Sequence, residues 1–193
     1  MIDTEVHLRG IADGNHAAFT ALYRGWQPIL VRYATGLLNG DREAAADVVD
    51  EALLAVWQQA GRFSGAGSSA GWLRRIVRNK AVDWLRRQRD VSLPSDELES
   101  AANSLPDPAK NPHELAAQQS DKSAVIEALQ TLSFDHREAI WLCYFEELSV
   151  QEIAEIAGCP ANTVKTRLFH ARRILRESNL LKQTRASDEE LFD

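Results

Sequence analysis

Four of the six prolines in this chain fall within one short segment, from Val91 to His113. The segment is also rich in serine and asparagine and holds few large apolar residues, a composition typical of a linker. We therefore predict two modules instead of one. They are an N-terminal module over residues 1–90 and a C-terminal module over 114–178, joined by a linker over 91–113 and followed by an acidic tail, 179–193, predicted to be disordered.

On both sides of the linker, apolar residues recur at helical spacing, and neither side shows sustained alternation of apolar and polar residues. The predicted fold class is therefore all-α, with two small helical domains joined by a flexible linker. A chain of 193 residues with 45% hydrophobic composition is long enough for both.

Cysteine usage and hydropathy indicate a cytoplasmic protein. Cys143 and Cys159 are too few for a disulfide framework and lack the paired spacing of a zinc site, so we expect buried thiols in a reducing compartment. No apolar signal segment opens the chain, and no stretch reaches the roughly 18 apolar residues of a membrane span. We expect no membrane insertion.

The net charge of −6 argues against a nucleic-acid partner only until its distribution is considered. Residues 62–90 hold eight Lys or Arg against two acids, and residues 161–185 hold seven against one, Glu177. Acids gather elsewhere, including residues 41–51. Two basic islands in an acidic protein indicate two separate DNA contacts.

Asn15 is predicted to cap the first long helix, which Pro28 is expected to kink or restart. Asp41 is predicted to cap a helix over 42–60 with two distinct faces. The inner face carries Val49, Ala52, Leu53, Val56 and Ala60, and the opposite face carries Asp47, Glu51, Leu54 and Gln58. Leu54 is either an isolated surface leucine or an anchor for a protein partner.

A glycine and serine loop, 61–69, follows this helix, and Ser69 is predicted to cap the next helix, over 70–89. One face of that helix carries Arg75, Arg78, Arg86 and Arg89, with Phe63 and Trp72 nearby. Cations beside aromatic faces suit single-stranded DNA. A solvated charged face beside core aromatics is the alternative, and composition does not decide between them.

The C-terminal module contains a predicted helix-turn-helix. Ser149 and Glu152 form a capping box, and Gly158 to Pro160 make a tight turn into a second helix that starts near Asn162. Its inner face is Val164, Leu168, Ala171 and Leu175, whereas Thr166, Phe169, His170 and Arg173 lie outside, with Lys165 at the edge. A solvent-facing Phe169 on a basic helix favours contact with a thymine methyl over a purely structural helix pair.

These segments resemble a known family. Residues 153–172 are similar to the region 4 helix-turn-helix of extracytoplasmic-function sigma factors of the sigma-70 family, and Arg137-Glu138-Ala139 resembles the opening of that domain. Residues 47–52, with Trp57, Arg62 and Phe63, resemble region 2.2 and its exit, and residues 71–87 are similar to regions 2.3 and 2.4. The resemblance covers residues 15–177 in the family's order.

The resemblance implies an alternative sigma factor that binds core polymerase, recognises a promoter and helps to melt it. The β′ coiled coil of the polymerase would be bound by Asp47, Asp50, Glu51, Leu54 and Trp57. The −10 element would be bound by Arg62, Phe63, Trp72, Arg75, Arg78, Asn79 and Arg86. Region 4, under the β flap, would read the −35 element with Lys165, Thr166, Phe169, His170 and Arg173. An anti-sigma factor is a further expected partner.

The chain departs from the family pattern at three positions, which leaves its promoter sequence open: Asp50 where glutamine is usual, Asn162 where glycine is common, and His170 where arginine is common.

The rival interpretation is a helix-turn-helix regulator that binds duplex DNA without core polymerase. That interpretation does not explain the segment from Trp72 to Arg87. An enzyme is not expected, because the histidines are scattered without a catalytic or metal-ligand grouping. No catalytic residue, cofactor, metal or small-molecule substrate is predicted.

Overall fold

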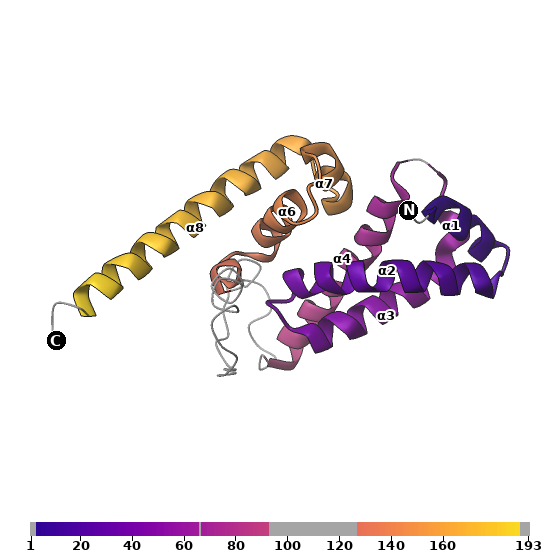
Figure 1. The fold of residues 1–193 in the computed structure, drawn as a ribbon, viewed down its shortest axis with the longest axis horizontal. Coiled ribbons are helices and arrows are strands. Elements are labelled where there is room, and N and C mark those ends of the chain that lie inside the picture. Colours follow the sequence, from indigo (N-terminus) through magenta and orange to yellow (C-terminus); the bar gives the residue numbers. More distant parts are fainter. Residues whose placement is uncertain (1–2, 66, 93–126, 190–193) are drawn as a thin grey trace.

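The computed structural model describes residues 3–65, 67–92 and 127–189, and every regular element within them is helical, which confirms the predicted all-α class. The first half contains α1 (Thr4–Ala12), α2 (His16–Leu37), α3 (Arg42–Gln59), the short 3-10 helix η1 (Ala60–Arg62) and α4 (Ser69–Ser92). The second contains α6 (Phe134–Tyr144), α7 (Val150–Ala157) and α8 (Ala161–Glu189). Figure 1 shows α1 to α4 gathered on one side and α6 to α8 on the other. The predicted linker, 91–113, lies outside the described residues from position 93 onward.

The predicted caps of the first half are confirmed at two of three positions. Asn15 accepts hydrogen bonds from the backbone N–H groups of residues 17 and 18, at 2.9 and 3.1 Å, and Asp41 accepts one from residue 44 at 3.0 Å. For α4 the prediction of Ser69 was wrong by one residue. Ser68 Oγ accepts from Gly71 N at 3.2 Å, because the capping side chain must stand just outside the helix that Ser69 begins.

Pro28 lies inside α2, which runs as one helix from His16 to Leu37. Of the predicted kink or restart at this proline, the continuous helix excludes the restart. Trp26 and Leu30, on either side of it, are both buried in the same core. Burial of a large apolar side chain is worth about 1.5–3 kcal/mol, comparable with the roughly 3 kcal/mol cost of an interior proline, so packing keeps the two turns in one helix.

The core of the first half forms where α2, α3 and α4 pack together. Val49, Leu53 and Val56 of α3 are buried, which confirms the predicted inner face of this helix. They share this core with Leu73 and Val77 of α4, both fully buried. The faces of α3 and α4 that are turned away from these residues take no part in the core of the first half.

The second half contains the predicted helix-turn-helix. The capping box of Ser149 and Glu152 is present, and Gly158 ends α7 in the left-handed conformation with φ 66°, which glycine adopts at low cost. Val164, Leu168 and Ala171 of α8 are buried, as predicted for its inner face. The buried side of α8 packs on α6 and α7. The turn at Gly158 and this packing together fix the orientation of α8.

Other predictions for the second half need correction. Helix α8 continues to Glu189, so most of the predicted disordered tail is helical, in keeping with a segment that has neither glycine nor proline before that residue. Cys143 and Cys159 are half-buried and not fully buried. Over the described ranges, no helix has the length and apolar character needed to cross a membrane.

Candidate functional site

The first part of α8 presents the residues predicted to read DNA. Lys165, Thr166, Phe169 and Arg173 are exposed, and Phe169 is 63% exposed although it is a large apolar ring. This face is opposite to the buried face of α8. It offers a cation, a hydroxyl and an aromatic ring side by side, which are groups suited to base edges and phosphates.

His170 differs from the other residues of this face because it is half-buried. Its ring lies edge-on to Phe169, with centroids 5.4 Å apart, and 6.3 Å from the ring of His136 on α6. Burial, and secondly the His170 ring, lowers the pKa of His136. In the part of the chain that the structure describes, no group of three His, Cys, Asp or Glu side chains suits a metal ion.

A second candidate surface, the outer surface of α3, consists of Asp47, Asp50, Glu51 and Leu54. All four are exposed, Leu54 at 56%. Tyr23 donates to Asp50 at 3.1 Å, a bond that raises the pKa of Tyr23. Glu51 lies 3.4 Å from Lys80 Nζ and 3.6 Å from an Arg87 nitrogen, so this surface is an apolar side chain among carboxylates that are partly paired. The structure thus places four of the five residues predicted for a protein partner on one exposed face.

Trp57, the fifth residue of that prediction, is half-buried. Its ring stacks on His16 with centroids 4.7 Å apart and meets Phe19 edge-on at 5.3 Å. Trp57 therefore joins α3 to α2 and supports the outer surface of α3 from its edge.

The residues predicted to hold single-stranded DNA are divided by the structure into exposed and packed groups. The exposed group is Arg62, Arg75, Asn79 and Arg86. Phe63 and Trp72 are half-buried and pack together, with ring centroids 5.6 Å apart. This aromatic pair joins the two ends of the glycine and serine loop.

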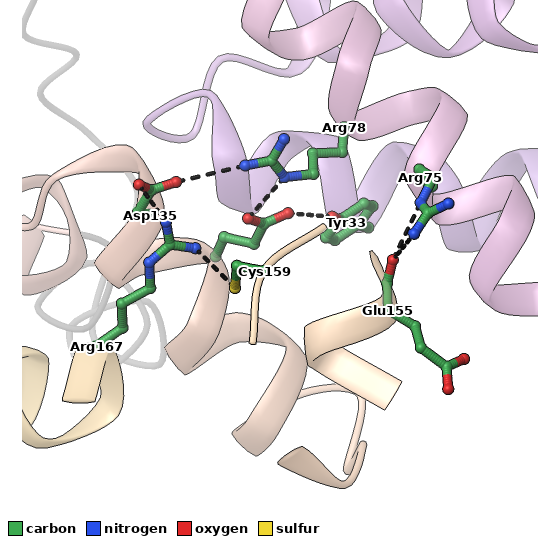
Figure 2. A network of polar contacts seen from close by, with 8 residues as sticks. Tyr33, Arg75, Arg78, Asp135, Glu155, Cys159 and Arg167 are labelled. Atoms are coloured by element: carbon green, nitrogen blue, oxygen red, sulfur yellow. Dashed lines mark hydrogen bonds and ion pairs between the residues drawn. The ribbon is translucent and has the colours of Figure 1, made fainter. Parts of the chain in front are cut away.

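The arginine face of α4, defined here as Arg74, Arg75 and Arg78, is directed at the second half of the molecule. Arg78 Nε donates to Glu138 at 2.9 Å, and its Nη2 lies 3.4 Å from Asp135. Only 17% of the Arg78 side chain is exposed. Arg78 was predicted to lie on a DNA-binding or solvated face of this helix, but in the structure α6 covers it (Figure 2).

Arg75 is also engaged by the second half. Its Nε donates to the backbone carbonyl of Glu155 at 3.0 Å, and its Nη2 donates to the same oxygen (Figure 2). Glu155 lies in the last turn of α7, where carbonyl groups lack partners within the helix and the helix dipole is negative. The guanidinium therefore caps the first helix of the helix-turn-helix.

Glu138 lies at the centre of these contacts and is 1% exposed. One carboxylate oxygen accepts from the Tyr33 hydroxyl at 3.0 Å, and the other accepts from Arg78. Burial raises the pKa of Glu138, although Arg78 opposes this rise. Burial and the neighbouring carboxylate raise the pKa of Tyr33 well above its ordinary value, so the phenol stays a donor. Sequence reasoning used Glu138 only as part of a family motif and missed this role.

Two other side chains complete the contact between the halves. Glu146 accepts from Arg74 at 2.6 Å and from Arg32 at 3.0 Å. The Trp141 ring lies against the backbone of Gly36, so closely that a Cβ there would overlap its carbons. The contact thus combines ion pairs of low exposure with tight apolar packing.

Asp135 connects this contact to α8. Besides Arg78, it pairs with Arg167 of α8 at 2.7 Å, as Figure 2 shows. Arg167 also approaches the sulfur of Cys159 at 3.6 Å. The start of α8 and the arginine face of α4 therefore share one carboxylate.

Comparison with known families gives two matches that follow the order of the two halves. Residues 22–91 match the family model described as sigma-70 region 2. Residues 122–175 match the model described as sigma-70, region 4.

Individual relatives agree with these matches. The chain is 35% identical over 170 residues to the ECF RNA polymerase sigma factor SigL of Mycobacterium tuberculosis, covering 86% of this chain and 92% of the relative. It is 34% identical over 181 residues to a probable RNA polymerase sigma factor, RfaY, of Xanthomonas campestris pv. campestris. That match covers 93% of this chain but only 45% of the relative's length.

Among solved structures, the sigma factor RpoE of Bartonella quintana, determined with the anti-sigma factor NepR, is similar with a TM-score of 0.64 and 29% identity. The match covers 85% of this chain and 96% of RpoE. CnrH, determined with the cytosolic domain of CnrY, has a TM-score of 0.66 at 24% identity, covering 94% and 99%, and so shares the fold.

Proposed function

Because this chain belongs to the sigma-70 family, as an extracytoplasmic-function member, we propose that its two halves divide promoter recognition between them. The protein is an alternative RNA polymerase sigma factor. We take residues 1–90 as the domain for core polymerase and the −10 element, and 114–178 as the domain for the −35 element. The observation that carries this division is that each half holds its own exposed basic helix residues, on α4 and on α8.

The start of α8 is proposed as the reader of the −35 element, with the second half placed under the β flap. Lys165, Thr166, Phe169 and Arg173 project from one exposed side of a helix whose other side is buried. Phe169 supports the proposal most, because an aromatic ring at 63% exposure adds nothing to the core of this domain and suits a thymine methyl. His170, at the edge of the face, is the fifth reader.

The −10 element is assigned to α4 and the loop before it. Arg62, Asn79 and Arg86 are exposed cationic or amide groups along this segment, and Phe63 with Trp72 supplies aromatic surface for an unstacked base. Arg75 and Arg78 complete the assignment once the second half moves away from them. Binding of an extruded base offsets a few kcal/mol of unstacking, which is how such a surface favours melting.

The outer surface of α3 is proposed to bind the β′ coiled coil of core polymerase, with Trp57 at its edge. An exposed leucine ringed by carboxylates suits a partner with an apolar pocket and a basic rim. An anti-sigma factor is proposed as the regulatory partner, by analogy with the complex of the Bartonella quintana relative. The cytoplasm is the proposed site of action.

In vitro transcription with purified core polymerase and a genomic DNA library tests the proposal. The parent protein should direct initiation at a discrete set of promoters. The Arg62→Ala/Arg86→Ala variant, which removes two exposed arginines, should form fewer open complexes, and its salt slope should fall by about 1 for each lost phosphate contact.

Arg9→Ala is the matched control, because Arg9 is an exposed arginine of α1 whose ion pair is with Glu5 of the same helix. It should transcribe like the parent. A double variant that melts promoters as well as the parent does would exclude α4 as the −10 surface.

A further inference from the structure

We propose that the −35 preference of this protein depends on pH, through a proton that is held by His170 and kept off its neighbour His136. The inference rests on the proposed function, since it takes the start of α8 as the −35 reader. It gives that reader two protonation states, each with its own choice of base.

The two imidazole rings lie on neighbouring helices. His136 is in the first turn of α6 and His170 is on α8, with ring centroids 6.3 Å apart and both residues half-buried. His170 also meets the exposed Phe169 edge-on at 5.4 Å. His170 therefore joins a ring of α6 to the exposed face that is proposed to read DNA.

The surroundings of His136 favour its neutral form. Its Nδ1 atom is buried and has no hydrogen-bond partner within residues 3–65, 67–92 and 127–189. An imidazolium carries an N–H on both nitrogens, so a proton on His136 would place an unsatisfied donor at this buried position. Burial, and secondly the His170 ring, accordingly lowers the pKa of His136. When one proton is available to the pair, His170 therefore holds it.

The charges that act on the pair come from α6 and α8. Asp135 raises the pKa of His136 and Arg167 lowers it, and these two side chains pair with each other at 2.7 Å (Figure 2). Arg173, one turn further along α8, lies 3.8 Å from Glu177. Of these groups only the imidazoles have an ordinary charge change between about pH 5 and 8. The other elements packed on α6 direct titratable groups to different partners, namely Tyr33 to Glu138, Arg78 to Glu138 and Asp135, and Glu152 to Ser149.

Protonation changes what His170 can read. A neutral imidazole donates from one nitrogen and accepts at the other, so it can bond to guanine or to the amino group of adenine or cytosine. An imidazolium only donates, and guanine offers two acceptors, O6 and N7, in the major groove. Hydrogen bonds from charged donors are about twice as strong as neutral ones. The protonated protein should therefore prefer guanine, and this preference should weaken as pH rises and the proton is lost.

The test is selection from a −35 promoter library by the full chain with purified core polymerase, at about pH 6 and about pH 8. The parent should enrich guanine at one −35 position about fivefold more at the lower pH. His170→Gln keeps a donor and an acceptor that do not titrate in this range, and should give the same preference at both pH values. His136→Phe, the matched control, keeps a ring on α6 and should retain the pH dependence of the parent.

Nitrogen NMR of the imidazoles in the free protein locates the proton without DNA. The same two variants assign the signals of His136 and His170. As pH falls, His170 should take up its proton before His136. The proposal is overturned if His136 is protonated first, if the parent selects the same −35 sequence at both pH values, or if the pH dependence survives in His170→Gln or disappears in folded His136→Phe.

Failure of this inference is distinct from failure of the proposed function. If α8 reads the −35 element but its choice of base does not depend on a proton, His170→Arg and Phe169→Ala still change the preference, while the parent behaves alike at both pH values. If α8 is not the reader, no variant of His170 or Phe169 changes the preference at either pH.

Discussion

The hydroxyl of Tyr33 donates a 3.0 Å hydrogen bond to Glu138, which lies 105 residues further along the chain. Tyr33 belongs to α2 and Glu138 to α6, and both side chains are buried. The bond joins the two halves of the protein where water is excluded. Loss of the Tyr33 hydroxyl would leave one buried oxygen of Glu138 without its donor, while the other oxygen keeps Arg78.

Tyr33→Phe should lower the free energy of unfolding by about 1–3 kcal/mol, because one buried carboxylate oxygen loses its donor. Urea unfolding measures this effect. The matched control is Tyr23→Phe, which removes a bond of 3.1 Å to the exposed Asp50 and should have a smaller effect because water replaces the donor. Equal losses in the two variants would contradict a special role for the bond between the halves.

Leu54→Asp should weaken capture of core polymerase by at least about 1 kcal/mol, since truncation of an interface anchor commonly costs this much. Helicity should not change, because Leu54 is 56% exposed. The control is Val6→Asp on α1, which places the same charge at a position of 58% exposure. Pull-down with purified core enzyme measures both. Binding equal to that of the parent would mean that the outer surface of α3 is not the polymerase contact.

Replacement of His170 by Arg should sharpen the −35 preference at one base pair by about 1–3 kcal/mol, the usual value of a bidentate contact with guanine. A neutral imidazole offers one donor and one acceptor, so the parent should discriminate less. Phe169→Ala should weaken binding mainly where a thymine methyl is lost. Selection from a −35 promoter library measures these effects. Identical preferences for the parent and both variants would exclude the start of α8 as the reader.

Ser149→Ala should destabilise the second half by about 1 kcal/mol, the typical value of an N-cap. Hydrogen bonds from the Ser149 side chain and backbone lower the pKa of Glu152. This carboxylate therefore stabilises the fold at pH values above its unfolded pKa of about 4.3, and the effect disappears as pH falls through the lower folded pKa. The parent should lose more stability than Ser149→Ala on acidification, as followed by thermal unfolding. Parallel pH curves would refute the capping contribution of Glu152.

The parts of this fold that were predictable depend on local sequence. The caps at Asn15 and Asp41, and the turn at Gly158, each rest on residues within one helical turn of the feature they define. The two faces of α3 follow from helical period alone. At Pro28 the helix does not restart, because burial on both sides of the proline keeps the two turns in one helix.

The contact between the halves was not predictable in this way. Arg74 meets Glu146 across 72 residues and Arg78 meets Glu138 across 60, and no periodicity encodes such distances. A basic stripe looks the same in sequence whether it faces water, DNA or a carboxylate. The one local sign was Glu138, a charged residue directly before the buried Ala139 and Ile140.

The pairing of Arg78 with Glu138 also has a kinetic consequence. Because the donors of Arg78 face Glu138 and Asp135, they must leave these carboxylates before they can bind phosphate, so separation of the two halves precedes DNA capture by this residue. The observed association rate of the free protein should therefore rise with DNA concentration and then level off. The rate at the plateau is the rate constant for separation of the two halves. In a variant whose halves are already separated, the association rate should show no plateau.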